Sequence, residues 1–303
     1  MTRAGRFAPS PSGELHVGNL RTAILAWLFA RSTGRDFLLR VENLDRARAG
    51  AEAGQLRDLA AIGVTWDGAV VRQTDRGAVY DEAIQQLTAA GLTYQCFCTR
   101  REIQEAPSAP HAPQGAYPGT CRNLSPAELE YKRSARPAAI RLRAAVTEFT
   151  VHDVLHGEFT GVVDDFVLRR NDGVTAYNLA VVVDDAAQGI DQVVRGDDLL
   201  SSTPRQAYLA SLLHMPVPEY AHVPLVVNSD GARLAKRDGA VTLADLSREG
   251  VPADKVRDII LQSVGLPAGT LETAVSAFRP ADLPREPWVW RGLPETGGPP
   301  AGR

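Results

Sequence analysis

The sequence predicts an α/β fold in which a parallel sheet is interrupted by an insertion. In the first 95 residues, a short apolar run of strand length is flanked by helical stretches, as expected when crossover helices connect parallel strands. A segment rich in Pro, Ala and Gly at residues 105–121 then breaks the pattern. Apolar runs return after residue 175, so we expect the sheet to resume there.

The chain opens with an irregular turn that leads into a helix. Residues 9–13 hold two prolines and a glycine, which exclude regular structure. Apolar residues then recur at helical spacing over residues 20–28, and Gly34 supplies the stop. His16 and Gly18 therefore stand at the helix N-terminus. Unpartnered backbone N–H groups and the helix dipole favour phosphate there, so the stretch predicts an anionic ligand.

The remaining elements follow from periodicity and from breakers. Residues 125–135 have a clear helix start, because Ser125 is followed by proline and then by Glu128. We expect strands at residues 35–41, 93–98, 176–185, 190–198 and 223–228. We expect helices at residues 49–62, 81–90, 125–135 and 204–213, and more helices between Gly231 and about residue 264.

These elements divide the chain into five parts. Residues 1–95 and 171–230 form the two halves of the sheet domain, and residues 96–170 form the insertion. A loop and a helical extension occupy residues 231–275, and a tail without fixed structure occupies residues 276–303. The insertion is the most basic region, which fits either a solvated helix face or a docking surface for phosphates. Its basic residues are Arg122, Lys132, Arg133, Arg136, Arg141 and Arg143.

The composition is that of an ordinary globular protein. The chain has 303 residues, of which 23% are charged, and a formal net charge of -3. This balance argues against nucleic-acid binding through bulk positive charge but leaves room for a local basic patch. No apolar stretch has the length of a membrane span or a signal peptide, so we expect a cytoplasmic protein without a membrane partner.

Four side chains form a candidate site for a small molecule. Arg6, Glu42, Tyr177 and Arg195 each lie at the end of an expected strand, where open α/β sheets bind ligands. The planar guanidinium of arginine donates two parallel hydrogen bonds to a carboxylate, and a carboxylate binds an ammonium group. The set fits an acidic amino acid, although each residue alone also fits a surface ion pair or a tyrosine at the edge of the core.

The three cysteines are candidate metal ligands. They do not make a disulfide framework, and a close pair such as Cys96 and Cys98 often indicates metal. Structural zinc prefers four tetrahedral ligands rich in sulfur, and Cys121 would be the third. Buried cysteines without metal are the alternative. His111, in the intervening loop, is a reserve ligand.

Two segments resemble the signatures of class I aminoacyl-tRNA synthetases. A proline-rich turn followed by a His-x-Gly-x box is similar to the phosphate-binding signature of that family. A basic loop flanked by glycines is similar to the lysine loop that closes over pyrophosphate, although Arg233 replaces its first lysine and Ala235 its serine. The first motif comprises Pro9, Ser10, Pro11, Ser12, Gly13, Glu14, Leu15, His16, Val17, Gly18 and Asn19. The second comprises Arg233, Leu234, Ala235, Lys236 and Arg237.

The resemblance implies a Rossmann-type catalytic domain that binds ATP. It assigns ATP contacts to His16, Gly18, Asn19 and Lys236, and it makes His16 and Lys236 the catalytic residues. His16 would donate to a phosphate oxygen as charge builds at the α-phosphorus, and Gly18 would let the backbone approach the nucleotide. Mg²⁺ is expected to accompany ATP.

The segments around the four candidate side chains resemble, in order and spacing, the glutamyl subgroup of these enzymes. The resemblance implies that the two arginines hold the substrate side-chain carboxylate, that Glu42 takes the α-amino group, and that Tyr177 lines the pocket. Asn43 stands where family members usually have aspartate. The implied glutamate-binding residues are Arg6, Phe7, Ala8, Pro9, Ser10, Glu42, Tyr177 and Arg195.

The cysteine pair followed by Tyr-x-x-x-Cys resembles the zinc motif of glutamyl-queuosine tRNA(Asp) synthetases, the short paralogues of glutamyl-tRNA synthetase. The resemblance implies one structural Zn²⁺ per chain that pins the insertion and takes no part in the chemistry. Its implied ligands are Cys96, Cys98, Tyr117 and Cys121.

Taken together, the resemblance covers residues 3–264 and implies a ligase-type enzyme. Such an enzyme activates L-glutamate with ATP, without tRNA, and transfers glutamate to the queuosine of the tRNA(Asp) anticodon. About sixty residues follow the lysine loop, so we expect no anticodon-binding domain, and we expect a monomer. Two alternatives remain, namely a truncated glutamyl-tRNA synthetase that charges a tRNA 3′ end and a non-catalytic RNA-binding paralogue.

Overall fold

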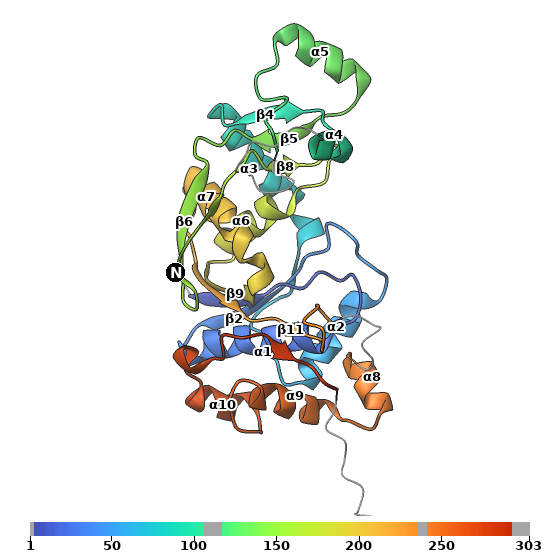
Figure 1. Cartoon of the computed structure of the whole chain (residues 1–303), viewed down its shortest axis with the longest axis vertical. Helices are drawn as coiled ribbons and strands as arrows, with labels where there is room; N and C mark the ends of the chain where they lie inside the picture. Colours follow the sequence, from blue (N-terminus) through green and yellow to red (C-terminus); the bar gives the residue numbers. More distant parts are fainter. Residues whose placement is uncertain (1–2, 106–116, 235–240, 293–303) are drawn as a thin grey trace, which may run out of the picture.

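A mostly parallel sheet of seven strands forms the centre of the fold (Figure 1). The computed structural model describes residues 3–105, 117–234 and 241–292, and within them the strand order is β3-β2-β1-β9-β10-β6-β7. Every neighbouring pair is parallel except the β6–β7 hairpin, which confirms the predicted class. The strands are β1 (Ala4–Phe7), β2 (Asp36–Val41), β3 (Val71–Arg72), β6 (Glu148–Asp153), β7 (Gly157–Val162), β9 (Ile190–Gly196) and β10 (Glu219–Val223).

Helices cover both faces of this sheet. Figure 1 shows α1, α9 and α10 on one side of β2 and β9, and α6 and α7 on the other. In the described part of the chain, no helix has the length and apolar character needed to cross a membrane. The main helices are α1 (Val17–Ser32), α2 (Ala51–Ala61), α3 (Gly77–Ala89), α6 (Tyr177–Ala187), α7 (Thr203–Leu212), α8 (Leu243–Arg248), α9 (Ala253–Gln262) and α10 (Leu271–Ala277).

Helix α1 is buried along most of its length because it lies between the sheet and α10. It approaches β1 closely, since a Cβ atom added at Gly5 would lie 2.9 Å from the Cβ of Ala30. The predicted boundaries are confirmed. The helix starts directly after His16 and ends at Ser32, and Gly34 follows with φ +67°, a backbone conformation that glycine adopts without strain.

The insertion forms a small antiparallel sheet and also extends the central one. Its small sheet, of order β4-β5-β8, consists of β4 (Thr93–Cys96), β5 (Ala139–Leu142) and β8 (Val167–Arg169). The expectation that residues 96–170 stand apart from the catalytic sheet is wrong for the β6–β7 hairpin, since β6 pairs with β10. The hairpin covers what would otherwise be an open sheet edge.

Helix α5 (Pro126–Ala135) has the predicted capping box and lies at one end of the molecule (Figure 1). The basic side chains near it are largely engaged within the protein. Arg122 forms an ion pair with Asp165, and Arg136 forms one with Glu102 of α4 (Arg100–Glu105). These pairs give Arg122 and Arg136 a structural role, and they do not decide between the two alternatives, a solvated face and a docking surface, that the sequence left for the region.

The apolar run at residues 176–185 is a helix and not the predicted strand. By periodicity, a continuous apolar run fits a buried strand and a buried helix equally well. Here it forms α6, which starts after Ala176 and buries both Asp184 and Asp185 at its far end. Tyr177 therefore lies at the start of a helix and not at the end of a strand.

Two predictions for the C-terminal part of the chain, at residues 223–228 and 276–292, differ from the structure. In the segment predicted as a strand at residues 223–228, Val223 ends the central strand β10 and only Val226–Val227 form a further strand, the short β11. Strand β11 pairs with β12 (Trp288–Val289). The expected tail is therefore wrong for residues 276–292, where Phe278, Leu283 and Trp290 are buried. Residues 293–303 lie outside the described residues.

A buried ion cluster lies near the carboxyl ends of β1 and β2. Arg40 is fully buried and donates to Asp185 at 2.7 Å and to Glu42 at 3.2 Å, and its Nε lies 3.7 Å from Asp184. Arg6 donates two further hydrogen bonds to Asp185. Burial alone would lower the pKa of Arg40, but the three carboxylates raise it above its ordinary value. Arg40 is therefore charged, and three carboxyl groups lie within 3.7 Å of its guanidinium.

We predict that Arg40→Met lowers the free energy of unfolding by about 3–5 kcal/mol, because it leaves buried carboxylates without their main cation. Urea unfolding followed by circular dichroism measures this loss. The control is Arg3→Met, which removes a guanidinium that is 67% exposed and should change stability little. A loss at Arg40 no larger than that at Arg3 would contradict the prediction.

Candidate active site

The carboxyl ends of the central strands open into a cleft of about 730 Å³. Strand β1 connects through α1 to β2 on one side, and β9 connects through α7 to β10 on the other, so the strand order reverses between β1 and β9. Open α/β sheets bind ligands at such a point. The predicted residues that line the cleft are Arg6, Phe7, Ala8, Pro9, Ser10, Ser12, Gly13, Glu14, Leu15, His16, Gly18, Asn19, Glu42, Tyr177, Arg195, Arg233 and Leu234.

His16 caps the N-terminus of α1 and borders the cleft. Its Nδ1 accepts a hydrogen bond from the Gly18 N–H at 3.1 Å, and its own backbone N–H donates to the Asn19 side chain at 3.3 Å. Burial lowers the pKa of His16, and the positive charge of Arg233 lowers it further. The ring is therefore neutral at neutral pH. Because Nδ1 accepts, the proton is on Nε2, and His16 can donate to an anion in the cleft.

Packing around His16 requires a glycine at position 18, which is a different reason from the expected approach of the backbone to a nucleotide. A Cβ atom at this position would lie 2.9 Å from Cε1 of His16 and 3.3 Å from the Cβ of Val226, so the imidazole fits only above a glycine. The first-turn N–H groups are also less open than predicted. That of Val17 donates to the carbonyl of Val241, and that of Gly18 donates to His16. Anion binding here then depends on the His16 Nε2–H and the helix dipole.

Around the second motif, the described residues on either side of residues 235–240 border the cleft close to His16. Thr242 forms an isolated β-bridge with His16, and Arg233 forms one with Val227. The Arg233 guanidinium lies 3.0 Å from a carboxylate oxygen of Asp198. Chain segments far apart in the sequence therefore meet at the start of α1. Outside the described residues lie three members of this motif, Ala235, Lys236 and Arg237.

Two members of the first motif do not line the cleft. Val17 is completely buried in the core against the sheet. Pro11 accepts a hydrogen bond from the Arg48 N–H through its carbonyl, so it shapes the turn. Both residues therefore position the motif and do not face the cavity.

Arg6 and Glu42 reach the cleft, and the ion cluster holds both of them. The bonds from Arg6 to Asp185 compensate its charge, so Arg6 offers a substrate carboxylate less free charge than the sequence suggested. Burial raises the pKa of Glu42 above its ordinary value, although Arg40 and Arg6 oppose this shift. The Glu42 N–H donates to the carbonyl of Pro9 at 3.0 Å, which joins the strand end to the opening turn.

Arg195 lies on β9 and also lines the cleft. Its Nε donates to Nε2 of His222 at 3.0 Å and its Nη2 donates to the hydroxyl of Thr203 at 2.9 Å. Its Nη1 lies 3.5 Å from the hydroxyl of Tyr177. None of these partners is a carboxylate, so among the described residues no hydrogen-bonded carboxylate compensates the charge of Arg195.

Asn43 occupies the position where aspartate was expected. Its side chain donates to the Thr74 hydroxyl and accepts from the Thr74 N–H, both at 3.0 Å. The amide therefore fastens the loop after β2 to the short helix η1 (Gln73–Arg76). An ionised carboxylate could accept the second of these bonds but could not donate the first.

A second cavity, of about 600 Å³, adjoins the cleft. The shared lining residues are Ser10, Ser12, Glu42, Tyr177, Leu199 and Arg233. Asp45, Arg46 and Arg170 line only the second cavity. The cleft is thus open to a second space on the side of Glu42 and Tyr177.

Sequence reasoning missed several residues that hold the cleft in shape. Gln55 of α2 is buried, and its side-chain N–H groups donate to the carbonyls of Ser10 and Gly13 at 3.0 and 2.7 Å, which fixes the opening turn. The ion cluster gave one weak signal in the sequence, namely charged residues inside or at the end of an apolar run. Arg40 is such a residue, and so are the two aspartates that end residues 176–185. No pattern in the sequence singles out Gln55.

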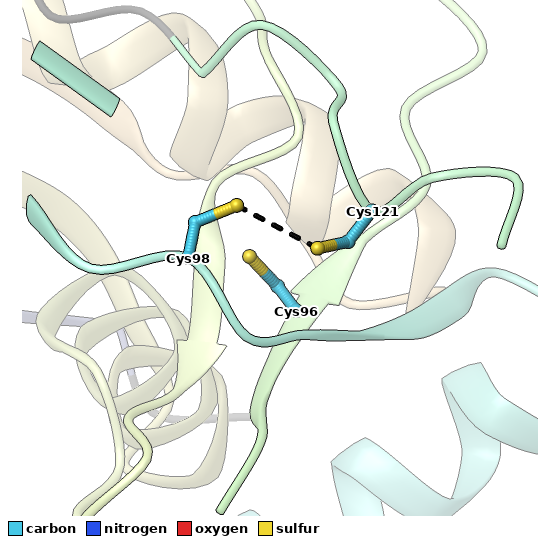
Figure 2. Close-up of side chains that lie close together, drawn as sticks. All are labelled: Cys96, Cys98 and Cys121. Atoms are coloured by element: carbon cyan, nitrogen blue, oxygen red, sulfur yellow. Dashed lines mark hydrogen bonds between the residues drawn. The ribbon is translucent and has the colours of Figure 1, made fainter. Parts of the chain in front are cut away.

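The three cysteines converge in the insertion, as Figure 2 shows. Their Sγ atoms lie within 4.8 Å of one another, and those of Cys98 and Cys121 are 3.6 Å apart. The hydroxyl of Tyr117 lies 3.3 Å from Sγ of Cys96 and 3.7 Å from that of Cys98. The structure thus brings the four predicted ligands together.

This geometry fits zinc. A Zn–S bond of about 2.3 Å places two sulfurs of a tetrahedral site about 3.8 Å apart, close to the separation of Cys98 and Cys121. Burial raises the pKa of Cys96, but hydrogen bonds to Tyr117 and Arg141 outweigh it and lower the pKa, whereas burial raises the pKa of Cys98 to about 12. Zinc binds the thiolate form of each cysteine, so binding would release these protons. The cluster's small core otherwise holds few large apolar side chains, so a metal would add a needed crosslink.

Comparison with known proteins identifies the family. The model of the class I tRNA synthetases for E and Q, catalytic domain, matches residues 4–275. The chain therefore belongs to this family, and it is a ligase-type enzyme. The predicted family is confirmed.

Individual relatives narrow the assignment. The chain is 65% identical to glutamyl-Q tRNA(Asp) synthetase of Nocardia farcinica, over 94% of this chain and 92% of that protein. It is 52% identical to glutamyl-Q tRNA(Asp) synthetase of Cutibacterium acnes, over 87% of this chain and 76% of that protein. Within the family, its resemblance is thus to the glutamyl-Q tRNA(Asp) synthetases.

Solved structures agree with the family. A glutamate tRNA ligase from Elizabethkingia meningosepticum in complex with its amino acid matches with a TM-score of 0.81 and 27% identity, over 94% of this chain and 66% of that one. Glutamate-tRNA synthetase from Elizabethkingia anophelis matches with a TM-score of 0.83 and 27% identity, over 95% of this chain and 68% of that one. The chain therefore spans about two thirds of the length of these two synthetases.

We predict that the purified protein carries about one zinc ion per chain and that Cys98→Ser lowers this content well below one, because a structural site needs all its ligands. Tyr117→Phe should also lower the content if the phenol is the fourth ligand. Elemental analysis after dialysis measures both.

The control for zinc binding is Tyr131→Phe, which alters a tyrosine of the same insertion that is 77% exposed and should leave the content unchanged. Wild-type protein that holds no zinc after growth in zinc-supplemented medium would contradict the metal site.

Proposed function

We propose that this protein activates L-glutamate with ATP, in the absence of tRNA, and then transfers glutamate to the queuosine of the tRNA(Asp) anticodon. The observation that carries the proposal is the convergence of three features on one cleft. These are the neutral His16 at the start of α1, the described residues that flank residues 235–240 of the lysine loop, and the pair Glu42 and Arg195.

The chemistry asks for positioning and for positive donors, not for a protein nucleophile. A carboxylate oxygen of glutamate forms a bond to the α-phosphorus of ATP, and the bond from that phosphorus to the bridging oxygen breaks, which releases pyrophosphate. His16 would donate its Nε2–H to a phosphate oxygen as charge builds, and Lys236 would bind the departing pyrophosphate. Mg²⁺, held mainly by the phosphates, would withdraw charge from them when bound.

Recognition of glutamate would use opposite charges at two points. Glu42 is one of the carboxylates that line the cleft, next to the opening turn, and we assign it to the substrate ammonium group. Arg195 brings uncompensated positive charge, which suits the side-chain carboxylate. Glutamine has no such charge, so it should be rejected.

The choice of acceptor rests on the relatives and on the second cavity. The proteins matched over most of their length are named glutamyl-Q tRNA(Asp) synthetases. The second cavity adjoins the cleft at Glu42 and Tyr177 and offers room for an acceptor nucleoside next to an adenylate. Charging of a tRNA 3′ end is the alternative, and the acceptor experiment separates the two.

We predict glutamate-dependent exchange of pyrophosphate into ATP without tRNA, and none with glutamine. His16→Ala and Lys236→Ala should each lower the exchange rate by about 100- to 1,000-fold, the usual effect of removing one donor to a developing charge. Isotope exchange measures the rates.

His16→Asn separates catalysis from helix capping, because asparagine caps a helix well but does not reach as far as Nε2. It should restore the unfolding temperature lost in His16→Ala and leave exchange low. Exchange in His16→Asn and Lys236→Ala at the wild-type rate would defeat the catalytic assignment.

For the acceptor, we predict that labelled glutamate is transferred to tRNA(Asp) that contains queuosine and not to the same tRNA with guanosine at that position. Transfer should persist when the 3′-terminal ribose lacks both hydroxyl groups, since that end is not the acceptor. Acid precipitation of labelled tRNA measures it. Transfer that requires the 3′-terminal hydroxyls, and not queuosine, would support the alternative acceptor and refute this one.

A further inference from the structure

A chain of buried polar groups stands behind Arg195. His222 of β10 has no exposed side-chain surface, and its Nδ1 lies 2.6 Å from a carboxylate oxygen of Asp153, which is also fully buried. The other ring nitrogen, Nε2, lies 3.0 Å from Nε of Arg195. Thr203, at the start of α7, accepts from Nη2 of the same guanidinium. Four elements thus meet at one arginine.

The hydrogen-bond partners define the protonation state of His222. A guanidinium can only donate, so Nε2 of His222 must accept from Arg195 and carries no proton. The ring proton is therefore on Nδ1 and is donated to Asp153. Burial lowers the pKa of His222, against the effect of Asp153, and Arg195 lowers it further, in agreement with a neutral ring.

The carboxylate of Asp153 accepts hydrogen bonds on both of its oxygens. One of its oxygens accepts from the N–H groups of Leu155 and His156, and the other accepts from the backbone N–H of His222 as well as from its ring. These hydrogen bonds outweigh burial and lower the pKa of Asp153. A carboxylate that already receives N–H donors on both oxygens leaves no alternative to the Nδ1–H form of His222.

The arrangement fixes the guanidinium of Arg195 without cancelling its charge. The bonds to His222, Thr203 and Tyr177 use three of the five N–H groups that an arginine has. His222 and Thr203 are neutral, in contrast to the aspartate that holds Arg6. The remaining N–H groups, and the full charge, are available to the cleft that Arg195 lines.

We propose that Asp153 and His222 are positioning residues for amino-acid selection: Asp153 holds His222 as the Nδ1–H form, and His222 holds Arg195 in the plane in which it reads the side-chain carboxylate of the substrate. This inference rests on the proposed function, since it deepens the account of how glutamate is chosen. A charged acceptor at position 222 would anchor Arg195 as firmly but would weaken its attraction for the substrate.

The test compares two replacements of His222 in the full-length protein. His222→Leu removes the acceptor and should raise the KM for glutamate about 10- to 100-fold, as expected when a hydrogen bond to a charged group is lost. The KM for ATP and kcat for exchange should change less than about 3-fold, and the preference for glutamate over glutamine should fall by a factor similar to the rise in KM. His222→Gln offers a neutral amide oxygen to Arg195 and should restore most of the affinity.

Asp153→Asn is the second variant, and it keeps the size of the side chain. An amide at this position presents a donor that conflicts with one of the N–H groups around it, so His222 can lose its fixed form. It should raise the KM for glutamate and spare that for ATP. The matched control is Trp27→Phe, which removes a partly buried hydrogen bond to the carbonyl of Thr65 but does not touch the cleft. It should lower the unfolding temperature with both KM values unchanged.

A merely structural role predicts a different pattern. If His222→Leu loses stability but keeps the wild-type KM for glutamate and the wild-type preference over glutamine, the positioning role is wrong. Equal KM values in His222→Leu and His222→Gln would also overturn it, because the acceptor would then not matter.

One measurement does not depend on activity. Nitrogen-15 NMR of the histidine rings in the ligand-free wild-type protein should show His222, assigned by its loss in His222→Gln, as the neutral Nδ1–H form. A protonated ring or the Nε2–H form would overturn the inference. If the wild-type protein shows that form but catalyses no glutamate-dependent exchange, the proposed function fails while the hydrogen-bond order at Arg195 stands.

Discussion

The contact between Arg40 and its carboxylate partners is the constraint on which the catalytic face depends. Arg40 lies on β2, Asp185 lies on α6, and Arg6 on β1 binds the same aspartate. Because an unpaired charge at this depth is costly, none of these elements can move without the others. The ends of two strands and one helix are thus held as a unit. Glu42 extends from this unit into the cleft, and its hydrogen bond with Arg40 fixes its position there.

The side of the cleft at the start of α1 depends more on main-chain contacts. The first N–H of α1 donates to the carbonyl of Val241, and His16 forms a β-bridge with Thr242. Arg233 forms a bridge with Val227 and an ion pair with Asp198, so residues 233 and 241–242, on either side of residues 235–240, are both fixed near this helix start. Buried ion pairs thus hold one part of the cleft, and backbone contacts with a single ion pair hold the other.

The sequence correctly predicted features that depend on neighbouring residues. It did not predict features that depend on contacts between residues far apart in the chain. The start of α1, the capping box at Ser125 and the cysteine spacing all lie within a few residues, and the structure has them as expected. The strand predicted for residues 176–185 is a helix, and its acidic end meets Arg40, which stands more than a hundred residues earlier, so this partner gives no local signal. The support of Arg195 by His222 and Asp153 joins three strands, and no local signal marks it.

The hairpin of β6 and β7 gives the insertion a second structural role, because it belongs to the central sheet. Asp153 stands at the end of β6, so a segment that looks like an accessory module in the sequence supplies a buried partner of His222, which in turn contacts Arg195 in the cleft. The candidate metal ligands and this hairpin lie in one stretch of sequence but belong to different parts of the fold, because β6 pairs with the central sheet. Under the proposed role of Asp153, an exchange of the whole insertion between paralogues would carry part of the substrate preference with it, and a graft that stops short of the hairpin would not.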